Sequence, residues 1–371
     1  MPETSPTPAL SPASRYVPPL TGIRALAALL VLGMHTGQNV PGDALTVLPF
    51  LARGYLGVDF FFVLSGFIIT HVYFASLAQP SRNGVRVFLW HRFIRLYPVH
   101  VTVLAALVIL ISIVHAKHIP LNYPQEWRFA DLPWQLTLLH AWGVTAKPGW
   151  NAPSWSISAE WFAYLSFPLL APVLTLVRDR VTALLIATAA LAGTALAFTV
   201  ADWSLNTWVG APALVRVFGE FLCGAALCRA VALAPNSPGL RGDLFGAAAF
   251  LLFLAGASMA MGDFGLVALL ALTIFGAATA NGFLAGMLGS RPFVWLGEIS
   301  YSIYMVHFPV LLVIRRFWER AGIGDWNASA RALAFLLTVA FVIALAAMLF
   351  YAVERPARMR LRDRMGKLAP V

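Results

Sequence analysis

Charged residues are scarce in this chain of 371 residues. Asp, Glu, Lys and Arg together make up 11% of it, against about 25% in soluble globular proteins. Apolar residues reach 60%, and the mean hydropathy is +0.77, so too few polar side chains remain to cover a soluble core. This composition excludes a soluble enzyme, a disordered protein and a nucleic-acid-binding module. The sequence predicts a polytopic membrane protein.

Acidic residues and cysteines are also few. The chain has 16 Asp and Glu residues and 26 Lys and Arg residues, which gives a formal net charge of +10. In an apolar chain, such a basic excess reports orientation in the membrane. Cys223 and Cys228 lie five residues apart in one apolar stretch. On a helix this spacing places them about 140° apart, so they are expected to pack in the interior without forming a disulfide.

Apolar stretches long enough to cross a bilayer recur along the chain. They predict an all-α polytopic membrane helical bundle of about ten transmembrane helices, near residues 20–37, 55–75, 98–116, 155–177, 181–200, 208–230, 241–260, 264–282, 292–314 and 332–353. Residues 1–19 hold six prolines and no apolar periodicity, so a disordered cytoplasmic tail is expected there. Residues 20–354 would form the transmembrane domain, and residues 355–371 a basic cytoplasmic tail.

The basic residues distinguish the two orientations of such a bundle. With both termini in the cytoplasm, 16 basic residues lie inside and eight outside, while Arg24 and Arg216 lie within spans. The positive-inside rule favours this arrangement. One loop argues against this orientation, because its four arginines would then lie outside the cytoplasm: Arg315, Arg316, Arg320 and Arg331. We expect a multi-pass protein of the inner (plasma) membrane with both termini in the cytoplasm.

The first span carries two ionisable residues, Arg24 and His35. Eleven residues of helix advance about 16 Å and rotate about 20° beyond three full turns, so both side chains lie on one face. Ionisable groups within a membrane are costly and usually face a functional cavity. Arg24 could instead extend to the interface, and His35 could be structural. Their shared face favours a functional site.

Two carboxylates lie near the outer ends of other spans. Asp59 begins the second span, where it could orient an imidazole such as that of His35 or cap the helix. Glu160 enters the fourth span from outside, two residues after Ser158. His35 and Glu160 are therefore predicted to reach a similar depth from different helices. Trp155 is one of six tryptophans between residues 127 and 161, which either mark the membrane interface or stack on a sugar.

Two further pairs have helical spacing. Arg92 and Arg95 are expected to be neighbours on a short amphipathic helix within residues 87–98, as an interfacial anchor or a phosphate clamp. Tyr304 and His307 are also three residues apart, and either helix packing or chemistry explains them. His115 and His118 lack further ligands, so no metal site is predicted.

The ordered set of these segments resembles acyltransferase family 3, whose members are integral-membrane acyltransferases. The resemblance rests on LTGIRALAALLVLGMH (residues 20–35), GVDFFFVLSGFIIT (57–70), RFIRLYP (92–98), WSISAEW (155–161), LGEISYSIYMVHFP (296–309) and ERPAR (354–358). It covers nearly the whole chain. Because the chain stops about 18 residues after its last span, it is similar to members without an appended hydrolase-like domain. Residues 20–354 would then be the acyltransferase domain.

The resemblance implies an acyl-CoA donor, with acetyl-CoA favoured, taken from the cytoplasm as a co-substrate. It also implies an acceptor hydroxyl on a carbohydrate, a small molecule or a lipid-linked glycan outside the cytoplasm, with no permanently bound cofactor. In this scheme Arg24, Arg92 and Arg95 would bind the CoA phosphates. His35 would act as general base, assisted by Glu160 and oriented by Asp59. The possible acceptor-site residues are Ser158, Tyr304, His307 and Trp155.

Two other functions fit the same composition. A transporter or flippase for a lipid-linked glycan would also bury Arg, His and Glu within its spans, although no inverted repeat is visible in the sequence. A regulator that binds acyl-CoA without turnover, or an acyltransferase of unrelated fold, is the third possibility. Cleavage of the thioester by purified protein distinguishes an enzyme from a transporter.

Overall fold

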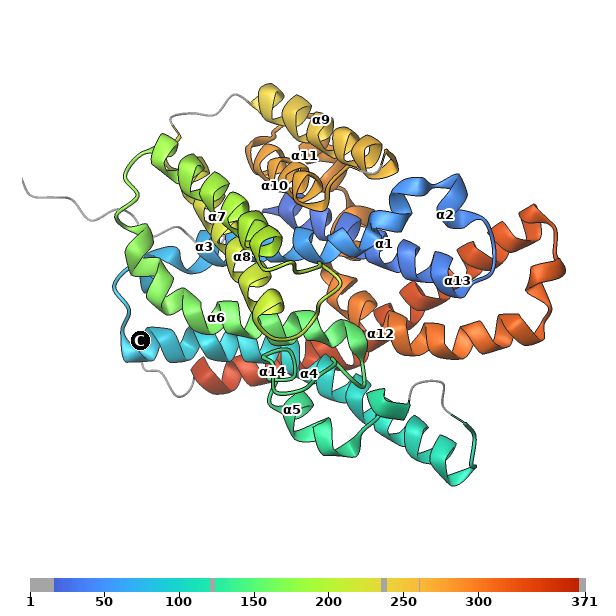
Figure 1. Ribbon diagram of the computed structural model, residues 1–371. Helices are drawn as coiled ribbons and strands as arrows, with labels where there is room; N and C mark the ends of the chain where they lie inside the picture. The colour runs from blue at the N-terminus through green and yellow to red at the C-terminus, as the bar shows by residue number, and fades with distance from the viewer. Residues whose placement is uncertain (1–16, 121–123, 235–238, 260, 367–371) are drawn as a thin grey trace, which may run out of the picture.

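The computed structural model of the protein describes residues 17–120, 124–234, 239–259 and 261–366 (Figure 1). Throughout these ranges the regular structure is helical and no β-strand occurs, so the all-α prediction is confirmed. Residues 1–16 and 367–371, which belong to the two predicted tails, lie outside the described residues. The first helix begins at Pro18, two residues earlier than predicted.

Nine helices in the described ranges are long and apolar enough to cross a membrane. They contain α1 (Pro18–Asn39), α3 (Gly57–Leu77), α4 (Arg82–Ala116), α6 (Trp155–Leu174), α7 (Arg180–Val200), α8 (Ala211–Ala232), α9 (Gly239–Ser258), α12 (Arg291–Arg320) and α13 (Ala328–Leu349). The tenth predicted span is the apolar helix α10 (Asp263–Thr279), which has 17 residues. This gives it a length of about 25 Å, slightly less than the hydrocarbon core of a bilayer.

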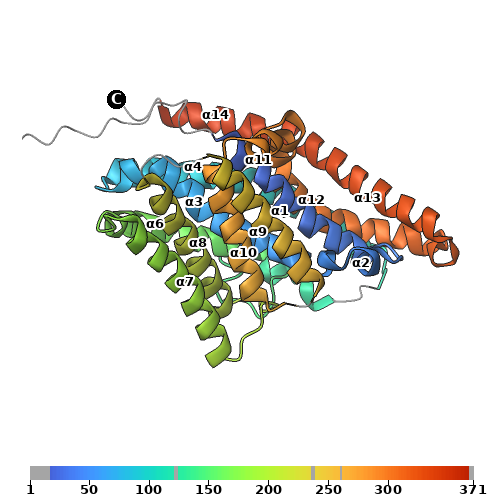
Figure 2. The ribbon, with the colours of Figure 1, turned by 90° about the horizontal axis from the view of Figure 1, so that it is seen from above.

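Short elements connect the spans. They are α2 (Ala44–Val47), η2 (Pro49–Leu56), η3 (Pro124–Glu126), η4 (Phe129–Asp131), α5 (Leu132–Leu136), η5 (Ala152–Ser154), α11 (Phe283–Leu288), η6 (Ile323–Asp325), η7 (Phe350–Glu354) and α14 (Arg355–Gly366). Seen from above, α14 lies at the same end of the bundle as α11 (Figure 2), and α11 packs against the beginning of α1.

Helix α1 lies in the interior and packs along α12, while α3 packs along α8. Glycines allow both contacts to be close. A Cβ atom at Gly297 of α12 would overlap the Thr21 carbonyl of α1, and one at Gly224 of α8 would overlap the Val63 carbonyl of α3. Small residues at such crossings let helix backbones approach and gain van der Waals contact inside a membrane. The two cysteines of α8 are buried and unpaired, as the sequence predicts.

The prediction of a separate interfacial helix within residues 87–98 is wrong. These residues are part of α4, which continues through Pro98 to Ala116. A proline inside a helix lacks the N–H that would bond the carbonyl four residues earlier, which here is that of Ile94. Next to this gap the Tyr301 hydroxyl of α12 donates to the Leu96 carbonyl at 2.5 Å, and the Thr102 hydroxyl donates to the Pro98 carbonyl at 2.8 Å. The helix therefore carries Arg92 and Arg95 into the bundle.

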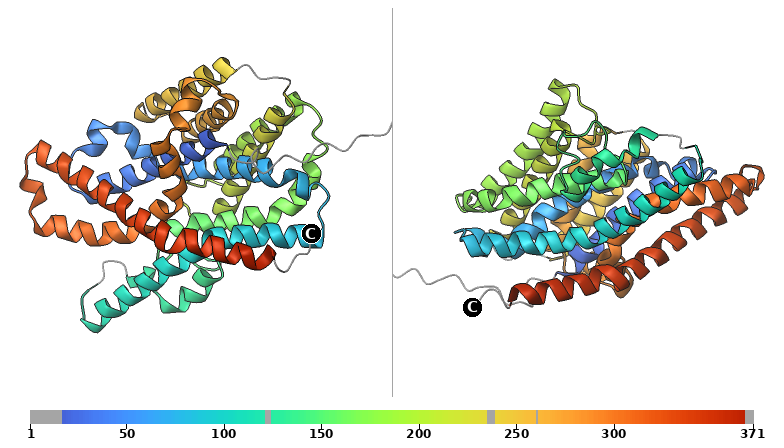
Figure 3. Two further views of the ribbon diagram at one scale, coloured as in Figure 1. Left: turned by 180° about the vertical axis from the view of Figure 1, so that it is seen from behind. Right: turned by 90° about the horizontal axis from the view of Figure 1, so that it is seen from below.

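The described part of the basic C-terminal segment is helical. Helix α13 passes through a π-helical turn, η7, into α14 (Figure 3). The indole Nε1 of Trp90 donates to the Leu361 carbonyl at 3.1 Å and thereby joins α4 to α14. Residues 355–366 thus form a helix that packs against the bundle.

We expect Gly224→Ala to lower thermal stability in detergent, because the added methyl group must displace the backbone of α3. Overpacking of this kind costs about 1–3 kcal/mol. The matched control is Gly193→Ala on α7, where an added Cβ meets no atom of the described structure within 4 Å. Equal melting temperatures for the two variants would contradict the close contact between α3 and α8.

Candidate active site

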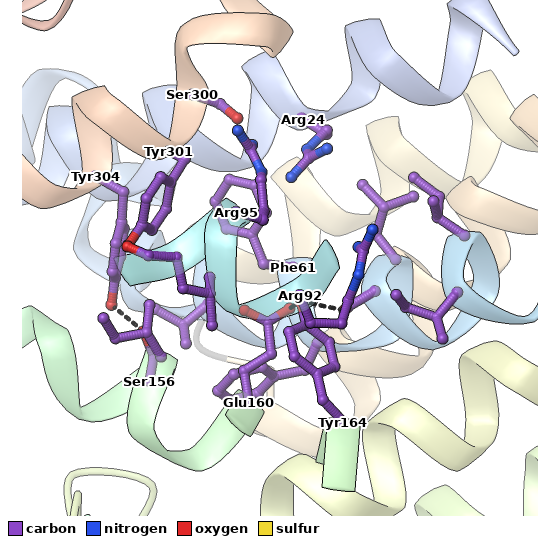
Figure 4. Close-up of a pocket in the computed structure, with 18 residues that line it drawn as sticks. Arg24, Phe61, Arg92, Arg95, Ser156, Glu160, Tyr164, Ser300, Tyr301 and Tyr304 are labelled. Atoms are coloured by element: carbon purple, nitrogen blue, oxygen red, sulfur yellow. Dashed lines mark hydrogen bonds between the residues drawn. The ribbon is translucent and has the colours of Figure 1, made fainter. Parts of the chain in front are cut away.

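A polar cavity opens within the bundle, between α1, α3, α4, α6 and α12 (Figure 4). Together with its mouth it holds about 740 Å³ of empty space. Its polar lining residues are Arg24, Ser65, Arg92, Arg95, Ser156, Glu160, Tyr164, Ser300, Tyr301 and Tyr304. Such a concentration of ionisable groups in an apolar bundle is the default candidate for a functional site.

Two arginines offer unfilled hydrogen-bond donors at this cavity. Arg24 of α1 points into it (Figure 4), and its buried Nε has no hydrogen-bond partner among the described residues. Arg92 donates from Nη2 to the Tyr73 hydroxyl at 3.1 Å, and its guanidinium lies over the rings of Tyr73 and Tyr164. Its Nε is also buried and without a partner within the described part. Desolvated guanidinium donors of this kind suit an anionic ligand.

Arg95 differs from these two because its charge is already compensated. It forms a buried ion pair with Glu354 of η7. The other carboxylate oxygen of Glu354 accepts a hydrogen bond from Ser302 of α12 at 2.7 Å, and Arg358 of α14 lies 3.5 Å from the paired oxygen. The pair therefore joins α4, α12 and α14. Arg95 also lines the cavity, so its direct binding of the donor stays a prediction beside this structural role.

Glu160 shares the cavity with Arg24, whereas His35 does not line it. The similar depth of Glu160 and His35 stays a prediction. The Tyr164 hydroxyl, one turn further along α6, donates to Glu160 Oε1 at 2.5 Å.

Two site residues on α6 were not predicted, Ser156 and Tyr164. They lie four residues before and after Glu160, so all three share one face of the helix. Ser156 donates to the Tyr304 hydroxyl at 2.9 Å, and Tyr304 donates to the Pro153 carbonyl at 2.8 Å. The spacing of polar residues at positions 156, 160 and 164 was a usable signal in the sequence.

The predicted acceptor-site role of Ser158 is not supported by its position. Ser158 is on the opposite side of α6, where its Oγ donates to the Leu138 carbonyl at 2.7 Å and accepts from the Ala141 N–H at 3.0 Å. These bonds fix the segment that precedes α6. Its hydroxyl is therefore already used by the backbone of that segment.

His35 contacts His307 of α12, with ring centroids 4.9 Å apart. His35 Nδ1 lies 3.0 Å from the Val31 carbonyl, and His307 Nδ1 lies 2.6 Å from the Tyr304 carbonyl. A carbonyl only accepts, so each Nδ1 carries a proton, and in the neutral imidazole each Nε2 keeps a lone pair. The Nε2 of His307 is buried and has no partner in the described residues. The ring of Tyr304, 5.6 Å from that of His307, connects this pair to the cavity.

Asp59 has a different partner from the one predicted. Its two carboxylate oxygens accept bonds from Nε and Nη2 of Arg216 on α8, at 2.7 and 2.6 Å. The Arg216 guanidinium also lies 5.2 Å from the ring of Trp155, and all three side chains are buried. Asp59 thus neutralises Arg216 and does not orient His35, while Trp155 packs against that pair. Arg216 was visible in the sequence as a charge within a span, but its partner was not.

Comparison with known proteins identifies the family. The model of an acyltransferase domain matches residues 19–351. The chain belongs to this acyltransferase family. It is 31% identical to the acyltransferase MdmB of Streptomyces mycarofaciens, over 96% of this chain and 94% of that protein. It is also 25% identical to the peptidoglycan O-acetyltransferase OatA of Listeria monocytogenes and 22% identical to the O-acetyltransferase OatA of Staphylococcus aureus, over 93% and 83% of this chain.

The two O-acetyltransferases are much longer than the region they share with this chain, which spans 56% and 53% of their lengths. No solved structure matches the chain. Membership of the family makes the protein a multi-pass membrane acyltransferase and confirms the resemblance seen in the motifs. It disfavours the transporter and regulator alternatives. Within the described part of the acyltransferase, no three His, Cys, Asp or Glu side chains gather closely enough to hold a metal ion.

The Arg95–Glu354 pair leads to a stability prediction. Arg95→Ala leaves the Glu354 carboxylate buried without its main partner, and breaking a buried ion pair on one side costs about 3–5 kcal/mol. We therefore expect a large fall in melting temperature in detergent. Arg86→Ala on the exposed side of the same helix should leave the melting temperature unchanged.

The double variant Arg95→Met/Glu354→Met tests whether an unpaired charge causes this loss. Because it removes both charges and fills the space with apolar side chains, it should recover most of the stability. A double variant as unstable as Arg95→Ala would show that packing, rather than charge, holds this junction.

Proposed function

We propose that this acyltransferase moves an acyl group from acyl-CoA to a hydroxyl of a carbohydrate, a small molecule or a lipid-linked acceptor outside the cytoplasm. Acetyl is the favoured group, because two relatives are named O-acetyltransferases. The observation that carries the donor assignment is the cavity in which Arg24 and Arg92 both present unfilled donors. The diphosphate of CoA matches such a pair, since planar guanidinium groups bind phosphate oxygens in bidentate fashion.

The placement of the arginines supports entry of the donor from the cytoplasm. Arg24 is near the beginning of α1, and its charge interacts with that of Arg358 on α14, so the two terminal helices meet at one end of the bundle. The distribution of basic residues favours this end as the cytoplasmic one. The protein would then lie in the inner membrane with both termini in the cytoplasm.

His35 is the proposed general base. It lies on the same helix as Arg24, about 16 Å towards the other end, and it is partly accessible. Its Nε2 would take the proton of the acceptor hydroxyl as that oxygen attacks the thioester carbonyl. The C–S bond then breaks, and the imidazolium returns the proton to the CoA thiolate, so that the step leaves no net charge. Donor and acceptor would meet where Tyr304 connects the cavity to the histidine pair.

Glu160 is proposed to orient the acceptor hydroxyl or assist its deprotonation. Its carboxylate faces the cavity and is held by the Tyr164 hydroxyl at 2.5 Å. Tyr304 is fixed by Ser156 and the Pro153 carbonyl, so this wall of the cavity is rigid before substrate arrives. Such preorganisation is what acyl transfer requires, because reacting groups must be held close to their transition-state geometry.

Release of free thiol from acetyl-CoA by the purified protein tests this proposal. We expect thiol release to depend on acceptor, which a membrane extract or a panel of hydroxyl compounds would supply. Comparison of glycan and secreted-metabolite masses between a deletion strain and its parent would identify the acceptor, as an acyl mass difference. Transport of a lipid-linked glycan without any thiol release would refute the proposed function.

Arg92→Ala should raise the Michaelis constant for acyl-CoA about tenfold or more while turnover at saturating donor falls much less. The reason is that a charge-assisted hydrogen bond to phosphate contributes about 1.5–3 kcal/mol to binding. Arg86→Ala, an exposed arginine on the same helix, is the matched control and should keep the wild-type constant. Unchanged donor affinity with lost turnover would assign Arg92 to the chemical step instead.

The proposed orientation can be measured separately by cysteine labelling in intact cells. Single cysteines placed in residues 1–16 and 367–371 should resist an impermeant thiol reagent, whereas one at Gly324 in the loop between α12 and α13 should react. The two native cysteines are buried, so they give little background. Labelling of either terminal cysteine in intact cells would show that this terminus lies outside the cytoplasm and would contradict the proposed topology.

A further inference from the structure

Helix α14 brings additional positive charge close to the arginines that line the cavity. Arg358 is four residues after Glu354 and Arg362 is eight residues after it, so all three share the face of the helix that turns towards α4. That face is fixed at two points, by the contact of Arg358 with Glu354 at 3.5 Å and by the bond from Trp90 to the Leu361 carbonyl at 3.1 Å. The side chain of Arg358 remains 45% exposed.

The arginines gathered here outnumber the carboxylates. The charge of Arg358 acts on those of Arg24, Arg92, Arg95 and Arg362. Among the described side chains, the carboxylates that act on these arginines are Glu160, Glu298 and Glu354. The five guanidinium groups thus exceed the three described carboxylates. Their mutual repulsion costs free energy at the edge of a low-dielectric region unless an anion binds among them. Arg24 and Arg92 also keep buried donors unfilled in the described structure.

We infer that Arg358 and Arg362 of α14 form a second anion subsite that binds the 3′-phosphate of the CoA donor. This inference rests on the proposed function and extends it to a part of the chain outside the cavity lining. CoA carries a diphosphate and, on the ribose of its adenosine, a separate phosphate monoester. With the diphosphate on Arg24 and Arg92, the nucleoside end lies at the mouth of the cavity. There Arg358 offers a partly exposed guanidinium that Glu354 holds in place.

The geometry makes α14 a component of the donor site. The π-helical turn η7 directs the helix across α4, and Glu354 in that turn fixes its rotation through Arg95 and Ser302. π-Helical turns often occur at functional sites. The segment predicted as a basic tail would therefore select donors that carry the 3′-phosphate over dephosphorylated ones.

The test compares the binding of CoA with that of dephospho-CoA, which lacks only the 3′-phosphate. The full-length protein is purified in neutral detergent, and binding is measured by calorimetry, so no acceptor is needed. We expect the wild type to bind dephospho-CoA at least about tenfold more weakly, as the loss of one charge-assisted phosphate contact predicts. Arg358→Ala should lower this ratio at least about threefold, and Arg358→Ala/Arg362→Ala should bring it close to one.

Arg360→Ala is the matched control. It removes the same charge from the same helix, but residue 360 is about 200° away from residue 358 around the helix axis, and its side chain is exposed. This variant should keep the wild-type ratio. Because Glu354 retains Arg95 and Ser302 when Arg358 is replaced, the Arg358 variants should fold, which a melting curve verifies.

Each other outcome overturns a defined part of the account. A wild-type ratio near one, or an Arg358→Ala ratio equal to that of the wild type, would refute the subsite while leaving acyl-CoA as donor. If Arg358→Ala keeps the ratio but loses affinity for vesicles of phosphatidylglycerol, the two arginines bind lipid phosphate, and the inference is wrong. If neither nucleotide binds the wild type, both the subsite and the proposed donor fail.

Discussion

The buried carboxylate of Glu354 is the interaction on which the donor end of the enzyme depends. It pairs with Arg95 of α4, accepts a bond from Ser302 of α12 and lies 3.5 Å from Arg358 of α14. Three helices that are distant in the sequence therefore meet at one side chain. A buried carboxylate is expensive unless it is fully compensated, so its partners are held in place. Arg95 uses its Nη1 in this role, whereas Arg24 and Arg92 each keep a buried Nε without a partner among the described residues.

The functional groups of the candidate site lie at two places along α1. At one end of this buried helix, Arg24 shares the cavity with Arg92 and Glu160. About three turns away, His35 contacts His307, and each imidazole is held through Nδ1 by a backbone carbonyl. Tyr304 is the physical link, because it lines the cavity and also packs against His307. The proposed function thus places anion binding and proton transfer at opposite ends of α1.

Much of the fold follows from the sequence, because the length and apolarity of each span are local properties. The positions of the spans, the shared face of Arg24 and His35 and the contribution of Glu160 to a site could be predicted for this reason. Pairings between helices could not. Asp59 is matched with Arg216, which lies 157 residues away, and no periodicity reports such a partner. Ser156 lies four residues before Glu160 and shares its face of α6, whereas Ser158 lies two residues before it and faces away. Pro98 suggests a helix boundary, but α4 continues through it to Ala116.

The most direct test of the account is the comparison of donor binding and acyl transfer in purified His35→Gln. His115→Gln is the matched control, since His115 makes the same hydrogen bond to the carbonyl four residues earlier but is exposed on α4. The account predicts that His35→Gln binds acyl-CoA with nearly wild-type affinity and transfers the acyl group at least about a hundredfold more slowly, the usual contribution of a general base. Transfer at more than about a tenth of the wild-type rate would contradict it, and so would parallel loss of donor binding and stability.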